Sequence, residues 1–137
     1  MEIIDAVSGV VAVVASVSKL SKKLNEIRDS YSSVALNIQL AAIQLASIRD
    51  ALENIAAWRL KVESETKAAR KLDAALADSI KGCAVLITVI DSKLGEAGYE
   101  PGVKGKINHI WLEDVLKGYI SNLDGQVRAL QLLLTSN

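Results

Sequence analysis

Few side chains in this 137-residue sequence are suited to catalysis or metal binding. His109 is the only histidine and Cys83 the only cysteine, so a zinc site of the usual four-ligand kind would need carboxylates from distant segments. Cys83 lies within an apolar stripe, which favours a buried and unreactive thiol. His109 precedes Ile110 and Trp111, which favours a surface or packing role over catalysis. We therefore expect no metal site.

Nucleophile and phosphate-binding motifs are also missing from the sequence. Its many serines form no nucleophile-elbow pattern, the arrangement that exposes a catalytic serine in α/β-hydrolases. The segment GEAGYEPGVKG (Gly95 to Gly105) lacks the GK[ST] ending of a phosphate-binding loop and has no strand before it. Paired carboxylates such as Glu63 and Glu65 are interspersed with basic residues, as on a solvated surface. We expect no catalytic residue, no cofactor and no small-molecule substrate, and hence no enzyme.

The overall composition restricts the classes of partner. Sixteen basic and sixteen acidic residues give a formal net charge of zero, so no global field attracts nucleic acid. Two tryptophans and three tyrosines are too few for a base-stacking platform. A hydrophobic fraction of 50% excludes intrinsic disorder. A single cysteine fits a reducing compartment, so we expect a cytoplasmic interaction domain without a nucleic-acid partner.

Apolar residues repeat in steps of three and four along three segments, which is the spacing of one face of an α-helix. The stripes run from Val34 to Ile55, from Leu72 to Leu94 and from Ile107 to Leu134. Gly95 stands where a helix-ending glycine is usual, and the segment from Gly95 to Gly105 is expected to be a loop.

The last stripe also contains two glycines, Gly118 and Gly125, which lie seven residues apart and so face the same way. They either allow another helix to approach closely or are simply tolerated, at about 1 kcal/mol each relative to alanine.

The opening segment IIDAVSGVVAVVASVSKLSKKL (Ile3 to Leu24) is rich in β-branched residues, which on propensity alone favour a strand. A lone strand among helices would have no partner for its backbone groups. Its acidic start and basic end also complement a helix dipole. The sequence therefore predicts an all-α protein: a single domain, residues 1–137, folded as a four-helix bundle of up-down topology with an apolar N-terminal helix.

This first helix is the candidate functional segment. Its longest charge-free run, Ala6 to Ser18, reaches roughly 20 Å as a helix, short of a hydrocarbon core of roughly 30 Å, so we expect no constitutive membrane span. Small residues at Ser8, Ala12 and Ser16 permit close helix–helix contact, either in a soluble bundle or in lipid.

The energy of transferring this helix into a membrane is predicted to lie near zero, because its aliphatic side chains offset its serines, Gly9 and Asp5. It would then either remain a core helix or insert after release and oligomerisation. The side chains that would contact the membrane are Ile3, Ile4, Val7, Val10, Val11, Val13, Val14 and Val17, with Lys19, Lys22 and Lys23 at the headgroups.

Four parts of the chain carry a resemblance to a known family. They are the opening MEIIDAVSGVVAVVASVSKLSKKLNEIRD, Trp58, the stretch CAVLITVIDSKL (Cys83 to Leu94), and the closing KINHIWLEDVLKGYISNLDGQVRALQLLL (Lys106 to Leu134) with Trp111 and Gln126. Together they resemble the HeLo-like N-terminal domains of fungal STAND-type (NLR-like) receptors, ankyrin-repeat proteins and related cell-death proteins.

The resemblance implies a helical bundle similar to the four-helix executioner domain of necroptosis pseudokinases. It implies self-association, then plasma-membrane targeting and permeabilisation through the first helix, here Ile3 to Leu20. It supplies no catalytic residues. We expect an effector domain at the N-terminus of a longer protein, cytoplasmic with conditional plasma-membrane association. The alternative is a soluble signalling or assembly module without membrane activity.

Overall fold

The computed structural model describes residues 3–30, 36–62, 66–100 and 107–135, and the side chains of residues 3–7, Ser30 and His109 lie outside this description. The described residues form four helices: α1 (Ile3–Ser30), α2 (Leu36–Lys61), α3 (Lys67–Glu96) and α4 (His109–Thr135). The predicted all-α fold is confirmed, and no strand occurs among these residues.

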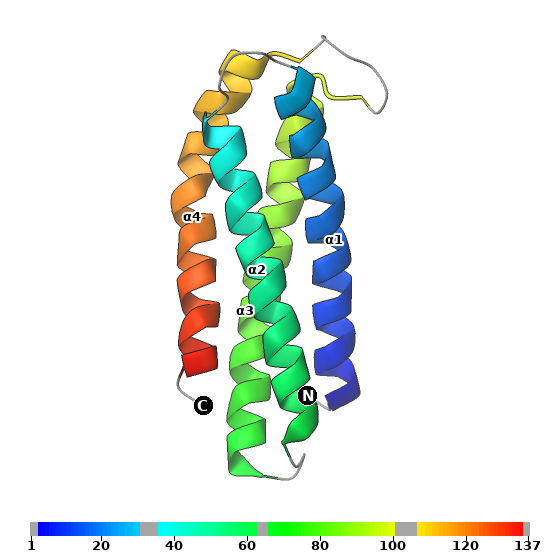
Figure 1. Ribbon diagram of the computed structural model, residues 1–137, viewed down its shortest axis with the longest axis vertical. Helices are drawn as coiled ribbons and strands as arrows, with labels where there is room; N and C mark the ends of the chain where they lie inside the picture. The colour runs from blue at the N-terminus through cyan, green and yellow to red at the C-terminus, as the bar shows by residue number, and fades with distance from the viewer. Residues whose placement is uncertain (1–2, 31–35, 63–65, 101–106, 136–137) are drawn as a thin grey trace.

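The helices alternate in direction, as the up-down prediction requires, and lie side by side in one long bundle (Figure 1). α1 and α4 each pack against both α2 and α3, so the order around the bundle is α1, α2, α4, α3. α1 therefore runs antiparallel to α2 and parallel to α3 (Figure 1). α1 consequently has two seams, one with α2 and one with α3.

Apolar side chains from all four helices fill the centre of the bundle. In α1 and α2 the buried positions alternate in steps of three and four, the spacing that packs antiparallel helices in bundles. The α1 set is Val10, Val13, Val17, Leu20, Leu24 and Ile27, and the matching α2 set is Ile38, Ala41, Leu45, Ile48, Leu52 and Ile55. α1 is helical despite its β-branched residues because this stripe packs on its neighbours while the backbone bonds remain within the helix.

Three different side chains cap the helix starts. The Thr66 hydroxyl accepts from the Ala69 N–H at the start of α3, and the Asn108 side chain accepts from the Trp111 N–H at the start of α4, both at 3.1 Å. α2 is capped from another helix: the Glu113 carboxylate of α4 accepts from the Ile38 N–H at 3.0 Å. Each oxygen satisfies an N–H that has no partner within its own helix.

The prediction that Gly95 ends the third helix is wrong. α3 continues to Glu96, and the left-handed residue is Gly98, with φ 97°. The N–H of Tyr99 donates to the Leu94 carbonyl and that of Gly98 to the Gly95 carbonyl, at 2.9 and 3.0 Å. This pair of bonds is the Schellman motif, in which the residue with positive φ follows the C-cap.

Gly118 and Gly125 face open space, because a Cβ added at either residue would have no neighbouring atom within 4 Å. They therefore do not accommodate a neighbouring helix within the described chain.

Candidate functional site: the first helix and its seams

One face of α1 is turned into the core. Val10, Val13 and Val17 are buried, and Val14 is half-buried against the core. Val11 points the other way, with 63% of its surface exposed. Ile3, Ile4 and Val7 belong to the helix, but their side chains lie outside the described residues. The predicted membrane-contacting residues are thus divided between the bundle interior and the solvent face.

The small residues predicted to pack against another helix do not do so among the residues that the structure describes. Ser8, Ala12 and Ser16 are all exposed, and the Ser16 hydroxyl donates to the carbonyl of Ala12 at 3.1 Å. The close contact is made instead by Gly9, where an added Cβ would lie 3.1 Å from Cδ1 of Ile80 in α3. The core stripe fixes the rotation of α1, and that rotation turns the series beginning at Ser8 toward solvent.

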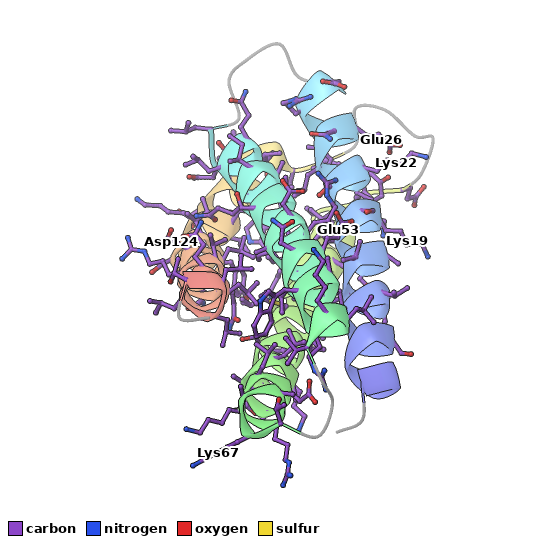
Figure 2. All side chains as sticks on the ribbon, turned by 60° about the horizontal axis from the view of Figure 1, so that its bottom comes forward. Lys19, Lys22, Glu26, Glu53, Lys67 and Asp124 are labelled. Atoms are coloured by element: carbon purple, nitrogen blue, oxygen red, sulfur yellow. The ribbon has the colours of Figure 1, made fainter. Side chains whose placement is uncertain are left out.

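The three lysines at the end of the apolar segment differ in their surroundings. Lys19 and Lys22 are exposed and project from the outer side of α1 (Figure 2). Lys23 instead donates to Asp91 of α3 at 2.7 Å, and its ammonium lies 5.8 Å from the centre of the Tyr99 ring. Lys19 and Lys22 are therefore available to an anionic surface, whereas Lys23 already holds α1 against α3.

A second contact strengthens this connection. The Tyr99 hydroxyl, just beyond α3, donates to the Glu26 carboxylate of α1 at 2.6 Å. Burial of the phenol, together with the neighbouring carboxylate, raises the pKa of Tyr99 to about 12, so the donor keeps its proton throughout the neutral range. Lys23, Glu26, Asp91 and Tyr99 together form what we call the α1–α3 latch.

The solvent face of α1 has an unusual composition. Between Ser8 and Ser18 its exposed side chains are all uncharged: Ser8, Val11, Ala12, Ala15, Ser16 and Ser18. The exposed face of α3 carries charges in the ordinary way, at Lys67, Lys71, Asp78 and Lys81. The stretch from Ser8 to Ser18 thus carries no charged residue on either its solvent face or its buried face, and the basic residues follow only from Lys19 onward.

Cys83 is buried, as predicted, with its Sγ 3.8 Å from the Gln126 side-chain oxygen of α4. Removal from water raises the pKa of the thiol to about 11, which keeps it protonated and unreactive at neutral pH. The side chain of His109 lies outside the described residues. Within the described part of the chain, no three or more His, Cys, Asp or Glu side chains are grouped so as to hold a metal ion.

Where the chain is described, no helix combines the length and the hydropathy needed to cross a bilayer.

The sequence reasoning missed two polar contacts between helices. Arg59 and Asp73 form a buried pair between α2 and α3, although the steps of three and four from Leu52 through Ile55 to Arg59 were a signal that Arg59 faces inward. The capping of α2 by Glu113 has no signature in the sequence, because the carboxylate and the N–H groups that it accepts from are far apart along the chain.

In the comparisons with known proteins, no family model, no curated protein and no solved structure matches this chain. The resemblance to HeLo-like domains therefore stays a prediction from the sequence.

Proposed function

We propose that this bundle is a cell-death effector domain of the HeLo-like kind, which on oligomerisation turns its first helix toward a membrane and permeabilises it. The observation that carries the proposal is the uncharged solvent face of α1 between Ser8 and Ser18. A helix face exposed permanently to water normally carries charged side chains, whereas this one exposes Val11 among alanines and serines. Its composition suits a second environment less polar than water.

The buried face of α1 supports a mechanism that needs a trigger. Six of its side chains, from Val10 to Ile27, are buried in the core. Burial of each contributes about 1.5–3 kcal/mol, so withdrawing the whole helix would cost on the order of 10 kcal/mol. That is comparable with the entire stability of an ordinary domain. Release therefore requires other molecules to replace these contacts, and oligomerisation at a membrane provides both neighbouring copies and lipid.

The basic residues would set the orientation of α1 at the membrane. Lys19 and Lys22 are exposed just after the uncharged face ends, and each basic residue near an anionic surface contributes about 1 kcal/mol. They would remain among the headgroups while the segment before them enters the lipid. The α1–α3 latch would have to open first, because it holds Lys23 on Asp91.

Dye release from anionic vesicles, with the chain oligomerised through an added coiled coil, tests the proposal. Val11→Asp places a carboxylate on the uncharged face, which opposes insertion by roughly 3 kcal/mol, without burying a charge in the bundle. Val85→Asp is the matched control, because Val85 of α3 has 62% of its surface exposed against 63% for Val11.

We expect Val11→Asp to abolish release and Val85→Asp to retain it, with both variants keeping the wild-type circular dichroism and melting temperature. Equal release by the wild type and Val11→Asp would contradict membrane entry through α1.

A soluble assembly module is the second candidate, and an exposed stripe on α2 favours it. Leu36, Leu40 and Ile43 follow one another at helical spacing and are all exposed. The double variant Leu36→Gln/Leu40→Gln should lower self-association measured by sedimentation if this stripe joins copies. Leu60→Gln, at another exposed leucine near the other end of α2, should not lower it. Self-association without dye release would support the soluble assembly module and contradict the membrane-permeabilising function.

A further inference from the structure

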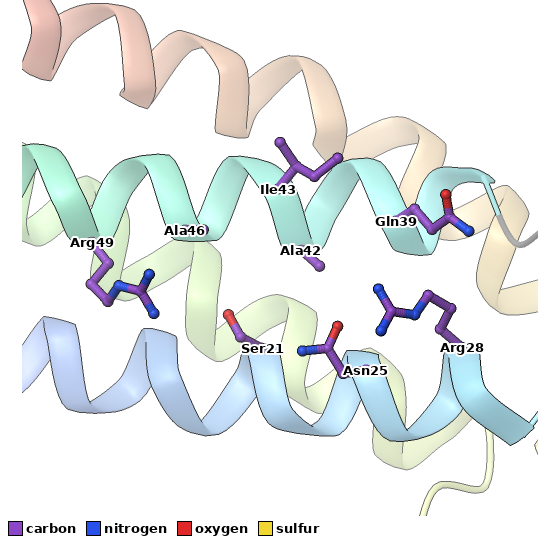
Figure 3. A pocket seen from close by; sticks show the side chains of 8 residues that line it. All are labelled: Ser21, Asn25, Arg28, Gln39, Ala42, Ile43, Ala46 and Arg49. Carbon is purple, nitrogen blue, oxygen red and sulfur yellow. The ribbon is translucent and has the colours of Figure 1, made fainter.

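A groove of about 370 Å³ runs along the seam between α1 and α2 (Figure 3). Ala42 and Ala46 of α2 line it, and their small side chains leave the space open. Ser21 and Asn25 of α1 point into it from the opposite helix (Figure 3). The middle of the groove therefore has methyl groups on the α2 side and hydrogen-bonding side chains on the α1 side, and Gln39 of α2 also lines it.

The hydroxyl of Ser21 is an unusual feature of this seam. Its oxygen is shielded from solvent and has no hydrogen-bond partner among the described residues. Buried polar atoms in folded proteins are nearly always paired, because leaving one unpaired is costly. A rotation of the Ser21 side chain about its Cα–Cβ bond would present this hydroxyl to an acceptor atom in the groove, which would give it the partner that the described residues do not provide.

Two arginines stand at the two ends of the groove. Arg28 of α1 and Arg49 of α2 turn their guanidinium groups into the space between the helices (Figure 3). Each donates through Nε to the aspartate next to it in the sequence, Asp29 at 3.3 Å and Asp50 at 3.4 Å. The terminal nitrogens of both guanidinium groups make no further hydrogen bond with the described residues, so they remain available to an anion.

We propose that this groove binds a small organic polyphosphate, with one phosphate at Arg28, another at Arg49, and Ser21 and Asn25 donating to the oxygens between them. Guanidinium groups bind phosphate through two parallel hydrogen bonds, and a site with one at each end selects an elongated ligand with anionic ends. On α1 the lining residues run from Ser21 to Arg28, roughly 10 Å of helix, and Arg49 of α2 stands at the end away from Arg28, so the groove suits an elongated ligand of linked phosphates (Figure 3).

The same phosphate chemistry occurs on lipid headgroups, but the geometry favours a free molecule. A headgroup carries its acyl chains on one side, whereas this groove runs lengthwise between two cationic ends (Figure 3). A bound polyphosphate would also touch α1 and α2 at once, so it would stabilise the packed position of α1 by mass action. This inference does not depend on membrane permeabilisation.

Isothermal titration of the full chain with sodium tripolyphosphate, and separately with inorganic phosphate, tests the site. We expect tripolyphosphate to bind more tightly than phosphate and to raise the melting temperature. Arg28→Gln and Arg49→Gln should each weaken tripolyphosphate binding by about tenfold or more, since each removes a charge-assisted contact. Arg128→Gln is the matched control, because Arg128 of α4 also donates through Nε to an aspartate, Asp124, but lies outside the groove.

Ser21→Ala separates a ligand contact from general charge attraction. It should weaken tripolyphosphate binding by about fivefold while leaving the melting temperature of the free protein unchanged or higher, because it removes an unpaired hydroxyl. Equal affinities for the wild type, Arg28→Gln and Arg49→Gln, or an equal loss in Arg128→Gln, would overturn the site. Binding to phosphatidylcholine vesicles that contain phosphatidic acid, without any binding of tripolyphosphate, would also overturn the proposal. The ligand would then be a lipid headgroup and not a free polyphosphate.

Discussion

Arg59 and Asp73 form a two-pronged ion pair inside the bundle. The Nε of Arg59 donates to one carboxylate oxygen at 2.6 Å and a terminal nitrogen donates to the other at 2.9 Å. The second terminal nitrogen donates to the Val62 carbonyl at 3.2 Å, just past the end of α2. Only 1% of Arg59 is exposed, and the hydrogen bonds from Arg59 to Asp73 raise the pKa of the guanidinium despite this burial. The pair thus joins α2 to α3 next to the segment that connects them.

Removing one member of this pair should cost far more than removing both. Asp73→Asn leaves the Arg59 charge buried without a counter-charge, and we expect a loss of about 3–5 kcal/mol in the free energy of unfolding. The double variant Arg59→Met/Asp73→Leu removes both charges and should return to within about 1 kcal/mol of the wild type. Urea unfolding followed by circular dichroism measures both changes.

An exposed pair provides the comparison. Arg128 and Asp124 of α4 form an ion pair at 2.9 Å on the surface, where the expected loss in Arg128→Met is below about 1 kcal/mol. A similar loss in Asp73→Asn and Arg128→Met would mean that the buried pair has water or another partner around it.

Glu113 should be important for α2 although it belongs to α4. Its carboxylate accepts from the N–H groups of Asn37 and Ile38, at 3.3 and 3.0 Å, where α2 has no acceptors of its own. Glu113→Ala should lower the free energy of unfolding by about 1–2 kcal/mol and speed amide exchange at Ile38. Asp114→Asn removes the exposed neighbouring carboxylate and should change neither. Unaltered exchange at Ile38 in Glu113→Ala would contradict the capping role.

Apolar stripes predicted three of the four helices, and the first was predicted from its terminal charges and from the lack of a partner for a lone strand, which left its rotation open. Valines occur on several sides of that helix, so the sequence pattern did not show whether Val10 or Val11 faces the core. The deciding signal lies further along: the stripe through Val10 continues to Leu20, Leu24 and Ile27, all buried. Following it would have placed Ser8, Ala12 and Ser16 on the solvent side, where the structure has them.

The polar contacts between helices were harder to predict from the sequence than the apolar stripes. A periodicity search treats every charged residue as surface, and so the burial of Arg59 was not predicted. The end of α3 illustrates a different difficulty, because Gly95 and Gly98 both stand near it. Only the hydrogen bonds from Gly98 and Tyr99 identify which glycine has the left-handed conformation.

Glycine-to-alanine substitutions should change stability differently at different sites. Gly118 and Gly125 lie on α4 with open space around them, so alanine at either position should stabilise the protein by about 0.5–1 kcal/mol. At Gly82 an added Cβ would lie 2.6 Å from the Gln126 side-chain nitrogen, which must move away from Cys83. We expect Gly82→Ala to gain less or to lose stability, measured by urea unfolding. Equal gains at all three sites would show that Gln126 moves freely.

Cys83 should make the protein less stable in alkali. Its pKa is raised from 9.0 to about 11 in the folded state, so above pH 9 the unfolded chain loses this proton while the folded chain keeps it. The associated stability is complete below pH 9 and is lost as the pH rises to about 11, amounting to about 3 kcal/mol.

The difference between the wild type and Cys83→Ala isolates this effect from the lysines and tyrosines that titrate nearby. Cys83→Ala should begin less stable at pH 7, because a buried side chain is shortened, and the gap between the two proteins should then narrow between pH 9 and pH 11. Tyr99→Phe is the control with a later window, since the pKa of Tyr99 is raised from 10.0 to about 12. A gap that stays constant from pH 7 to pH 11 would mean that Cys83 ionises as readily in the folded chain as in the unfolded one, which its complete burial between α3 and α4 opposes.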